Sequence, residues 1–162
     1  MLRVVVMGVS GAGKTTVGLA LAARLGLTFV DADDLHPAAN VAKMAAGTPL
    51  TDDDRGPWLA IVGDTLAEAG EPGIVIACSA LKRSYRDAIR ARGDDVFFVH
   101  LTAAPEVLRE RLGHRAGHFM PASLLDSQFA ILEPLGSDER GATIDVGVPP
   151  AAVLDAAVDA LL

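Results

Sequence analysis

A glycine-rich segment near the start of the chain combines the residue types that bind phosphate groups. Residues 8–15 read Gly-Val-Ser-Gly-Ala-Gly-Lys-Thr and match the pattern G-x-x-x-x-G-K-[ST]. Glycines let a backbone fold around an anion, and a helix that begins at the end of the loop directs its positive dipole end to the same place. The Lys14 ammonium can reach the β- and γ-phosphates, and the Thr15 hydroxyl can ligate Mg²⁺.

This match is specific. Roughly 0.002–0.003 accidental matches are expected in a chain of this composition. The segment also has the required context, because an apolar run precedes it and an amphipathic stretch follows it. It therefore predicts a nucleoside triphosphate site. The residues expected to contact the nucleotide are Gly8, Val9, Ser10, Gly11, Ala12, Gly13, Lys14, Thr15 and Thr16.

A second group of reactive side chains lies in the acidic segment 31–37, which reads Asp-Ala-Asp-Asp-Leu-His-Pro. Asp31 and Asp33 directly follow a short predicted strand, so we expect them at the carboxyl edge of a sheet, where α/β proteins bind ligands. Phosphoryl transfer needs Mg²⁺ beside the phosphates and a carboxylate that orients the attacking hydroxyl. Two carboxylates one residue apart in an extended chain point to opposite sides and could serve these two tasks. A solvated acidic loop is the alternative interpretation.

Other segments narrow the class of nucleotide-binding protein. The sequence has no Asn-Lys-x-Asp segment, which signalling GTPases use to read guanine. The predicted strand over residues 73–78 is followed by serine, whereas motor and transporter ATPases usually have an aspartate at the end of such a strand. A short chain with an acidic segment after its second strand and an arginine-rich segment late in the sequence is typical of a kinase for a small molecule or a nucleoside monophosphate.

The hydrophobic pattern predicts the elements that position these residues. Short apolar runs alternate with amphipathic stretches of helical length. Strands are predicted over residues 2–7, 28–30, 73–78, 96–101 and 143–146. Helices are predicted over residues 14–25, from 51 onward, and over 81–92, 105–112, 121–132 and 150–162. This alternation predicts βαβ units with right-handed crossovers, a parallel sheet and a three-layer α/β sandwich.

Length and composition exclude several classes of protein. The 162 residues favour one domain, and the net charge of −7 is the wrong sign for a surface that coats nucleic acid or an anionic membrane. Every apolar run is shorter than the roughly 18 residues of a membrane span. The single cysteine, Cys78, forms no internal disulfide and fits a reducing compartment. We expect a cytoplasmic domain with no nucleic-acid or membrane partner.

Several motifs extend the acidic segment toward a known family. They read Asn-Val-Ala-Lys-Met at 40–44, Asp-Asp-Asp-Arg-Gly-Pro-Trp-Leu at 52–59, Cys-Ser-Ala-Leu-Lys at 78–82, Tyr-Arg-Asp at 85–87, Gly-His-Phe-Met at 117–120 and Gln-Phe at 128–129. In this order they resemble the signature of the small bacterial gluconokinases, which are related to the shikimate kinases. The resemblance covers nearly the whole chain, and the segment 33–59 is specific to that family.

The resemblance implies both an activity and an architecture. The implied reaction transfers the γ-phosphate of ATP, with Mg²⁺, to the 6-hydroxyl of D-gluconate and gives 6-phospho-D-gluconate and ADP. The implied fold is a single P-loop kinase domain over residues 1–162, of the shikimate and adenylate kinase type, often assembled as a homodimer. It has a five-stranded parallel sheet in the order 2-3-1-4-5 and a lid at about 113–122. The tail departs from the family pattern at 147–149, where Gly-Val-Pro replaces more polar residues.

Analogy with such kinases also implies roles for the reactive residues. Asp33 is expected to bind and orient the acceptor hydroxyl, and Asp31 to hold Mg²⁺ through water, beside Thr15. Lys14 is expected to stabilise the phosphates during transfer. His36 could hydrogen-bond a sugar hydroxyl or serve as a structural residue of a turn.

Gluconate is an anion, so cations must offset the repulsion by the two aspartates. The planar guanidinium of Arg55 suits a carboxylate; a local ion pair with Asp52 or Asp54 is the alternative. Lys82 and Arg86 are four residues apart on a predicted helix face, from which they could reach the substrate or pair with acidic groups nearby.

The arginine-rich stretch 109–118 is locally positive in an acidic chain. Cations placed where charge builds up favour phosphoryl transfer, and a mobile lid that excludes water is a common way to supply them. Arg111 is expected to contact adenine or the phosphates, Arg115 to act on the transferring group, and His118 to bind substrate. The alternative is that the arginines cap the end of a helix.

Two other functions fit part of the pattern. A kinase for another small polyol acid, such as shikimate, would use the same scaffold. A regulator that binds ATP without an acceptor would need neither the two carboxylates at the sheet edge nor the arginine-rich segment.

Overall fold

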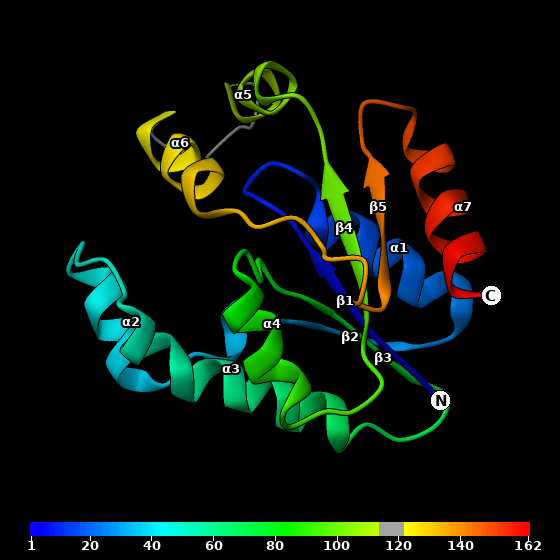
Figure 1. Ribbon diagram of the computed structural model, residues 1–162, viewed down its shortest axis with the longest axis horizontal. Coiled ribbons are helices and arrows are strands. Elements are labelled where there is room, and N and C mark those ends of the chain that lie inside the picture. Colours follow the sequence, from blue (N-terminus) through cyan, green and yellow to red (C-terminus); the bar gives the residue numbers. More distant parts are fainter. Residues whose placement is uncertain (114–121) are drawn as a thin grey trace.

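The computed structural model describes residues 1–113 and 122–162 and contains one five-stranded parallel sheet. The strands are β1 (Leu2–Met7), β2 (Thr28–Asp31), β3 (Gly73–Ala77), β4 (Phe97–Thr102) and β5 (Gly141–Asp145). Their order is β2-β3-β1-β4-β5, which confirms the predicted order (Figure 1).

Helices cover both faces of this sheet. They are α1 (Lys14–Leu25), α2 (Ala38–Ala45), α3 (Asp52–Ala67), α4 (Arg83–Arg90), α5 (Pro105–Gly113), α6 (Ala122–Ile131) and α7 (Pro150–Leu161). Figure 1 shows α1 and α7 on one side of the sheet and α3 and α4 on the other. The fold is therefore the predicted three-layer sandwich.

Each face of the sheet has its own apolar core, because successive side chains of a strand point to opposite faces. The core on the side of α1 and α7 includes Val4, Val6, Leu21 and Val153. The core on the side of α3 and α4 includes Val5, Met7, Val62 and Ile89. The continuous apolar sequence of β1 follows from its burial between both cores.

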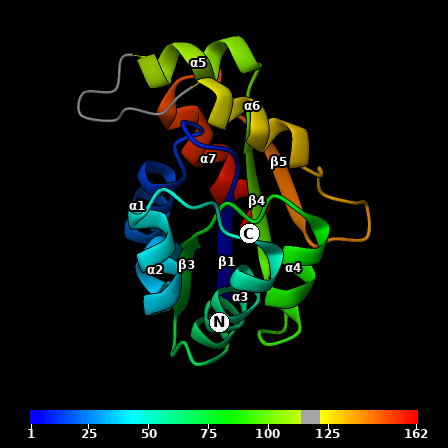
Figure 2. The ribbon, with the colours of Figure 1, turned by 90° about the vertical axis from the view of Figure 1, so that its left-hand side faces the viewer.

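The carboxyl ends of the parallel strands meet at one edge of the sheet, and α5 and α6 lie beyond it (Figures 1 and 2). The loops after β1, β2 and β3 open at the same edge, so the glycine-rich and acidic segments come together there. Within residues 1–113 and 122–162, no helix is long and apolar enough to cross a membrane.

Three local features concern the site. The short 3₁₀ helix η1 (Ala32–Leu35) and α2 form in a segment for which the sequence pattern predicted no helix. The start of α3 is as predicted: Thr51 caps it, and Thr51 and Asp54 form a reciprocal capping box. Finally, α4 begins at Arg83 rather than at residue 81, because Lys82 has an extended backbone with φ −98° and ψ 147°.

Candidate active site

The loop between β1 and α1 has the geometry of a phosphate cradle. Gly13 precedes α1 with a left-handed backbone at φ 92°, and Gly11 has φ 84°. Gly8 passes so close to β4 that an added Cβ would lie 2.7 Å from the carbonyl oxygen of Leu101. These positions need glycine, and they aim the positive end of α1 into the loop.

The cradle makes two polar contacts that a nucleotide would meet. The Lys14 Nζ donates to the Val9 carbonyl at 3.2 Å, so the ammonium lies folded over the loop. The Ser10 N–H donates to Oε1 of Gln128 in α6 at 2.7 Å. Gln128 was part of the family motif but not of the predicted site, because a lone glutamine on a helix has no spacing that points to a loop 118 residues away.

An apolar cavity of about 410 Å³ adjoins the cradle, and its far wall comes from the loop between β5 and α7. Its lining includes Gly11, Thr16, Arg111, Val146, Val148 and Pro150. Its size and apolar walls suit a flat nucleobase held next to phosphates in the loop. The segment 147–149, where the sequence departs from the family pattern, thus supplies part of the cavity wall through Val148.

Arg111 lines this cavity and donates to the Val146 carbonyl, which fixes its guanidinium against the loop after β5. Arg109 pairs with Asp126 of α6 at 2.6 Å and so links α5 to α6. The predicted lid residues Arg115 and His118 lie outside the described residues, as does nearly all of the segment 113–122.

Asp31 and Asp33 stand beside the cradle. The Thr15 hydroxyl donates to Oδ2 of Asp31 at 3.2 Å, and Oδ1 of Asp31 accepts the Asp33 N–H at 2.9 Å. The sequence predicts both acids in an extended chain, but Asp31 instead caps η1, and Asp33 lies in the first turn of that short helix. Asp31 and Thr15 offer adjacent oxygen atoms, which are the ligand type that Mg²⁺ prefers.

Asp33 has an environment suited to proton chemistry. Burial and the neighbouring Asp31 raise its pKa above the ordinary value, while the Lys14 ammonium opposes that rise. The carboxylate of Asp33 therefore lies within the electrostatic reach of the phosphate-binding lysine. A raised pKa makes it a better acceptor for the proton of an alcohol.

His36 contacts the ring of Trp58 and the side-chain amide of Asn40. Its ring stacks on Trp58 with centroids 4.2 Å apart and planes 14° apart. The Asn40 amide nitrogen lies 3.2 Å from its Nδ1, and because an amide nitrogen only donates, the ring proton is placed on Nε2. Burial, opposed by Asp33 and reinforced by Arg55, lowers the pKa of His36, so it is neutral near pH 7 and can offer Nε2–H to a hydroxyl.

Beyond His36 lies a group of four side chains that we name the Asp52 cluster: Asp52, Arg55, Lys82 and Tyr85. Asp52 accepts from the Tyr85 hydroxyl at 2.6 Å and from Lys82 Nζ at 3.2 Å. Arg55 lies 3.5 Å from Asp52 and donates to the Leu50 carbonyl. Both cations lie over the Tyr85 ring, 5.6 Å and 5.4 Å from its centroid. The structure thus brings Arg55 and Lys82 together.

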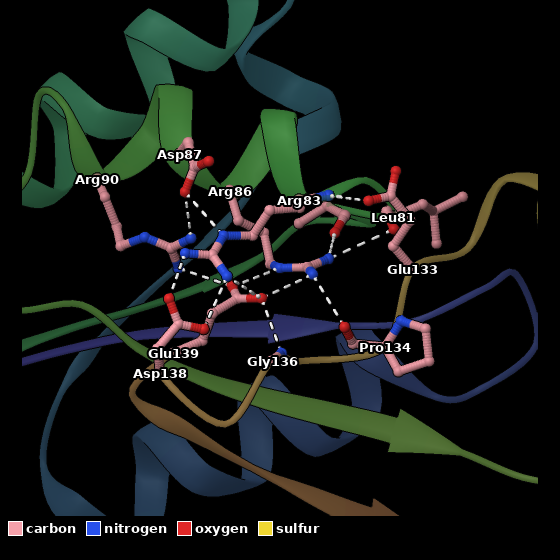
Figure 3. Close-up of polar contacts among 11 residues, drawn as sticks. Leu81, Arg83, Arg86, Asp87, Arg90, Glu133, Pro134, Gly136, Asp138 and Glu139 are labelled. Atoms are coloured by element: carbon pink, nitrogen blue, oxygen red, sulfur yellow. Dashed lines mark hydrogen bonds and ion pairs between the residues drawn. The ribbon is translucent and has the colours of Figure 1, made fainter.

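Arg86 has a different location. Its side chain is 0% exposed, and its Nε and Nη2 donate to both oxygens of Glu139 at 2.7 Å and 2.9 Å. Its remaining bonds go to the carbonyls of residues 80, 81 and 134 (Figure 3). Arg86 therefore fastens α4 to the segment before β5, and the structure does not bring it to the other predicted substrate ligands.

The sequence is similar to those of known kinases. A family model described as shikimate kinase matches residues 10–128. A gluconokinase of Gluconobacter oxydans is 59% identical over 140 residues, which cover 83% of this chain and 77% of that protein. The thermosensitive gluconokinase of Escherichia coli is 47% identical over 139 residues, which cover 84% of this chain and 74% of that protein.

Solved structures give the same result. The crystal structure of a gluconokinase from Sinorhizobium meliloti matches with a TM-score of 0.89 at 47% identity, over 99% of this chain and 91% of that one. The shikimate kinase of Aquifex aeolicus matches with a TM-score of 0.63 at 19% identity, over 99% of this chain and 96% of that one, and shares the fold.

Proposed function

The chain belongs to the gluconokinase family, within the shikimate-kinase group of P-loop kinases, and from this premise we propose how its residues perform the reaction. The proposed reaction is transfer of the γ-phosphate of ATP to the 6-hydroxyl of D-gluconate. The observation that carries the proposal is the position of Asp33, whose carboxyl lies beside both the metal-side acid Asp31 and the phosphate-side cation Lys14.

On the donor side, the cradle and the apolar cavity would bind different parts of the nucleotide. The backbone N–H groups of the loop and the start of α1 would hold the phosphates, and Lys14 would move from the Val9 carbonyl onto the β- and γ-phosphates. The cavity that Val148 and Arg111 line would hold the base. Thr15 and Asp31 would hold Mg²⁺, which screens the charge on the phosphate oxygens.

On the acceptor side, Asp33 would accept a hydrogen bond from the 6-hydroxyl and aim its oxygen at the γ-phosphorus. Its raised pKa favours transfer of the alcohol proton to it as the new P–O bond forms and the bond to ADP breaks. His36 would donate from Nε2 to a hydroxyl along the chain of the sugar acid. Arg55 and Lys82 would bind the carboxylate at the other end and offset its repulsion by the aspartates.

The remaining expectations are also proposals. Length and composition support a single kinase domain and a cytoplasmic location. The family resemblance supports a homodimer and a lid at about 113–122, in which Arg115 acts on the transferring group and His118 binds substrate. Light scattering of the purified protein tests the dimer, and Arg115→Ala tests the lid through a fall in turnover at saturating ATP.

A coupled assay of ADP release with a panel of acceptors tests the proposed function directly. ADP release should depend on gluconate, and ³¹P NMR should show a phosphate monoester at its 6-position. Shikimate and other sugar acids should react at least about a hundredfold more slowly, because the polar groups of the site would be left unpaired. No gluconate-dependent ADP, or faster turnover of another acid, contradicts the assignment. Tight ATP binding without turnover of any acceptor would favour a regulator instead.

A further inference from the structure

Asp52 has more polar partners than an exposed acid normally keeps. Its side chain is 61% exposed, yet it accepts from a tyrosine hydroxyl and a lysine and lies near an arginine. The hydrogen bonds from Tyr85 and then Lys82 lower its pKa. An acid at this position is charged at neutral pH and accessible to a ligand that arrives from solvent.

The side-chain cap of α3 is formed without this acid. The capping box there is made by Thr51, whose hydroxyl accepts the Asp54 N–H, and by Asp54, whose carboxylate accepts the Thr51 N–H. Lys43 pairs with Asp54 at 2.7 Å. The contacts of Asp52 are therefore directed away from the helix cap, toward Lys82 and Tyr85 on the other wall of the site.

Hydrogen bonds connect His36 to the helix turn that carries Asp52, because the Asn40 amide nitrogen lies 3.2 Å from Nδ1 of His36 and donates to the Asp54 carbonyl at 3.0 Å. Asp33 is within electrostatic reach of Lys14 and His36. His36 is in turn within reach of Arg55, which belongs to the Asp52 cluster. A linear acid whose terminal hydroxyl lies at Asp33 would thus extend past His36 and bring its carboxylate to the donors that Asp52 now engages.

We propose that Asp52 is a built-in competitor for the carboxylate of the acceptor, and therefore a residue that sets the affinity for the acid substrate. Without acceptor, its carboxylate holds Lys82 and Tyr85. When the sugar acid binds, its own carboxylate takes over these donors and Asp52 turns to solvent. This inference rests on the proposed function, because it needs an acid acceptor with its reacting hydroxyl at Asp33.

Two matched variants test the proposal. Asp52→Asn removes the competing charge with little change of shape. Asp53→Asn removes the same charge from the same exposed helix turn, so it controls for net charge and for the helix dipole. Titration calorimetry should show gluconate bound about two- to fivefold more tightly by Asp52→Asn, with the gain reduced in high salt. Asp53→Asn should match the wild type, and neither variant should change ATP affinity.

Unchanged or weaker gluconate binding by Asp52→Asn, relative to Asp53→Asn, would overturn the proposal. If the wild type phosphorylates gluconate but Asp52→Asn binds it no more tightly than Asp53→Asn does, only the proposed role of Asp52 is refuted. If the wild type neither binds nor phosphorylates gluconate, the proposed function fails, and this inference fails with it.

The single tyrosine of the chain gives a readout that does not need turnover. Burial and then the hydrogen bond to Asp52 raise the pKa of Tyr85. Near-ultraviolet absorbance should therefore show a lower Tyr85 pKa in Asp52→Asn than in Asp53→Asn, over the pH range in which circular dichroism shows an intact fold. Equal Tyr85 titration in both variants would contradict the contact on which the proposal depends.

Discussion

The stretch from Lys82 to Arg90 supplies cations to two charge clusters that differ in almost every respect. In the Asp52 cluster only Asp52 is largely exposed, whereas Arg55 and Lys82 are half-buried and Tyr85 is buried. The second, which we name the Glu139 network, consists of Arg83, Arg86, Arg90, Asp87, Asp138 and Glu139, and joins α4 to the segment before β5 (Figure 3). At its centre the side chain of Glu139 is 1% exposed and lies within 4 Å of three arginines.

Backbone conformation and burial, rather than spacing, separate the two clusters. Lys82 and Arg86 are four residues apart and were predicted on one helix face. Since α4 begins only at Arg83, the extended backbone of Lys82 turns its side chain toward α3, while the helix carries Arg86 inward. Exposed ion pairs add little to stability, whereas removal of one partner of a buried pair strands a charge. We therefore expect the Asp52 cluster to control substrate binding and the Glu139 network to control folding.

The largest effect should come from the acid at the reacting end of the acceptor side. Asp33→Asn keeps the shape of the side chain but removes the proton acceptor, so turnover should fall by about 10²–10⁴-fold. Steady-state kinetics and calorimetry should show ATP affinity within about threefold of the wild type, because Asp33 is assigned to the acceptor hydroxyl and not to the nucleotide. Turnover within about tenfold of the wild type would remove Asp33 from its assigned role.

Substitution in the Glu139 network should lower stability rather than turnover. Glu139→Gln leaves the buried guanidinium of Arg86 without its countercharge, and the free energy of unfolding should fall by about 3–5 kcal/mol. Urea denaturation measures this change. Asp138→Asn is the control, since it removes an exposed member of the same network, and its effect should be small by comparison. If Glu139→Gln were as stable as Asp138→Asn, burial would not distinguish the two clusters.

Lys82→Met should have the reverse profile, with a change in binding and little change in stability. Loss of a charged donor to the substrate carboxylate should raise the KM for gluconate by about tenfold or more. The KM for ATP should not change. Arg83→Met is the matched control, because it removes the neighbouring cation, which pairs with Asp138 and Asp87 instead. A KM for gluconate that rises equally in both variants would assign the effect to net charge.

The smallest expected difference is in pH dependence. Burial and Asp31 raise the pKa of Asp33, so kcat/KM should fall with acid at a midpoint above the usual aspartate value of about 3.9. Burial would raise the pKa of Glu139, but its bonds from Arg86, the Gly136 N–H and Arg90 lower it to about 2.

The two pKa shifts act in different pH ranges. The stability that Glu139 contributes is complete above its unfolded pKa of about 4.3 and is lost only as the pH falls toward 2. Activity should therefore decline in acid before the fold does. Parallel pH profiles of kcat/KM and circular dichroism measure this, and coincident loss of both would contradict it.

Glycine spacing was enough to predict the phosphate cradle, and the strand pattern was enough to predict a parallel sheet between helices; the strand order came from the family resemblance. The loop needs glycine where its backbone is unusual, as at the positive φ of Gly13, and the strands need apolar residues where they are buried. Both requirements can be recognised from neighbouring residues in the sequence. The conformation of Asp33 was not predictable in this way. It depends on Asp31 capping η1, and η1 is a short turn without the repeating pattern of a longer helix.

Contacts between segments that are distant in the chain could not be predicted from the sequence either. The apolar cavity is lined by both Gly11 and Val148, and Gln128 reaches Ser10, because α6 and the loop after β5 return to the same sheet edge. The partner of Arg86 is Glu139, 53 residues away, and no helical spacing links them. Residue types suggested which side chains carry charge, but only the fold decides which of those charges meet.

In the proposed mechanism, Asp33 presents the 6-hydroxyl of gluconate to a nucleotide held in the β1–α1 loop. A crystal structure with Mg²⁺, gluconate and a non-hydrolysable ATP analogue tests it most directly. It should show the 6-oxygen about 2.6–3.2 Å from the Asp33 carboxylate and facing the γ-phosphorus, with the substrate carboxylate against Lys82 and Arg55. Gluconate bound away from the terminal phosphate, with Asp33 turned to solvent, would contradict the account.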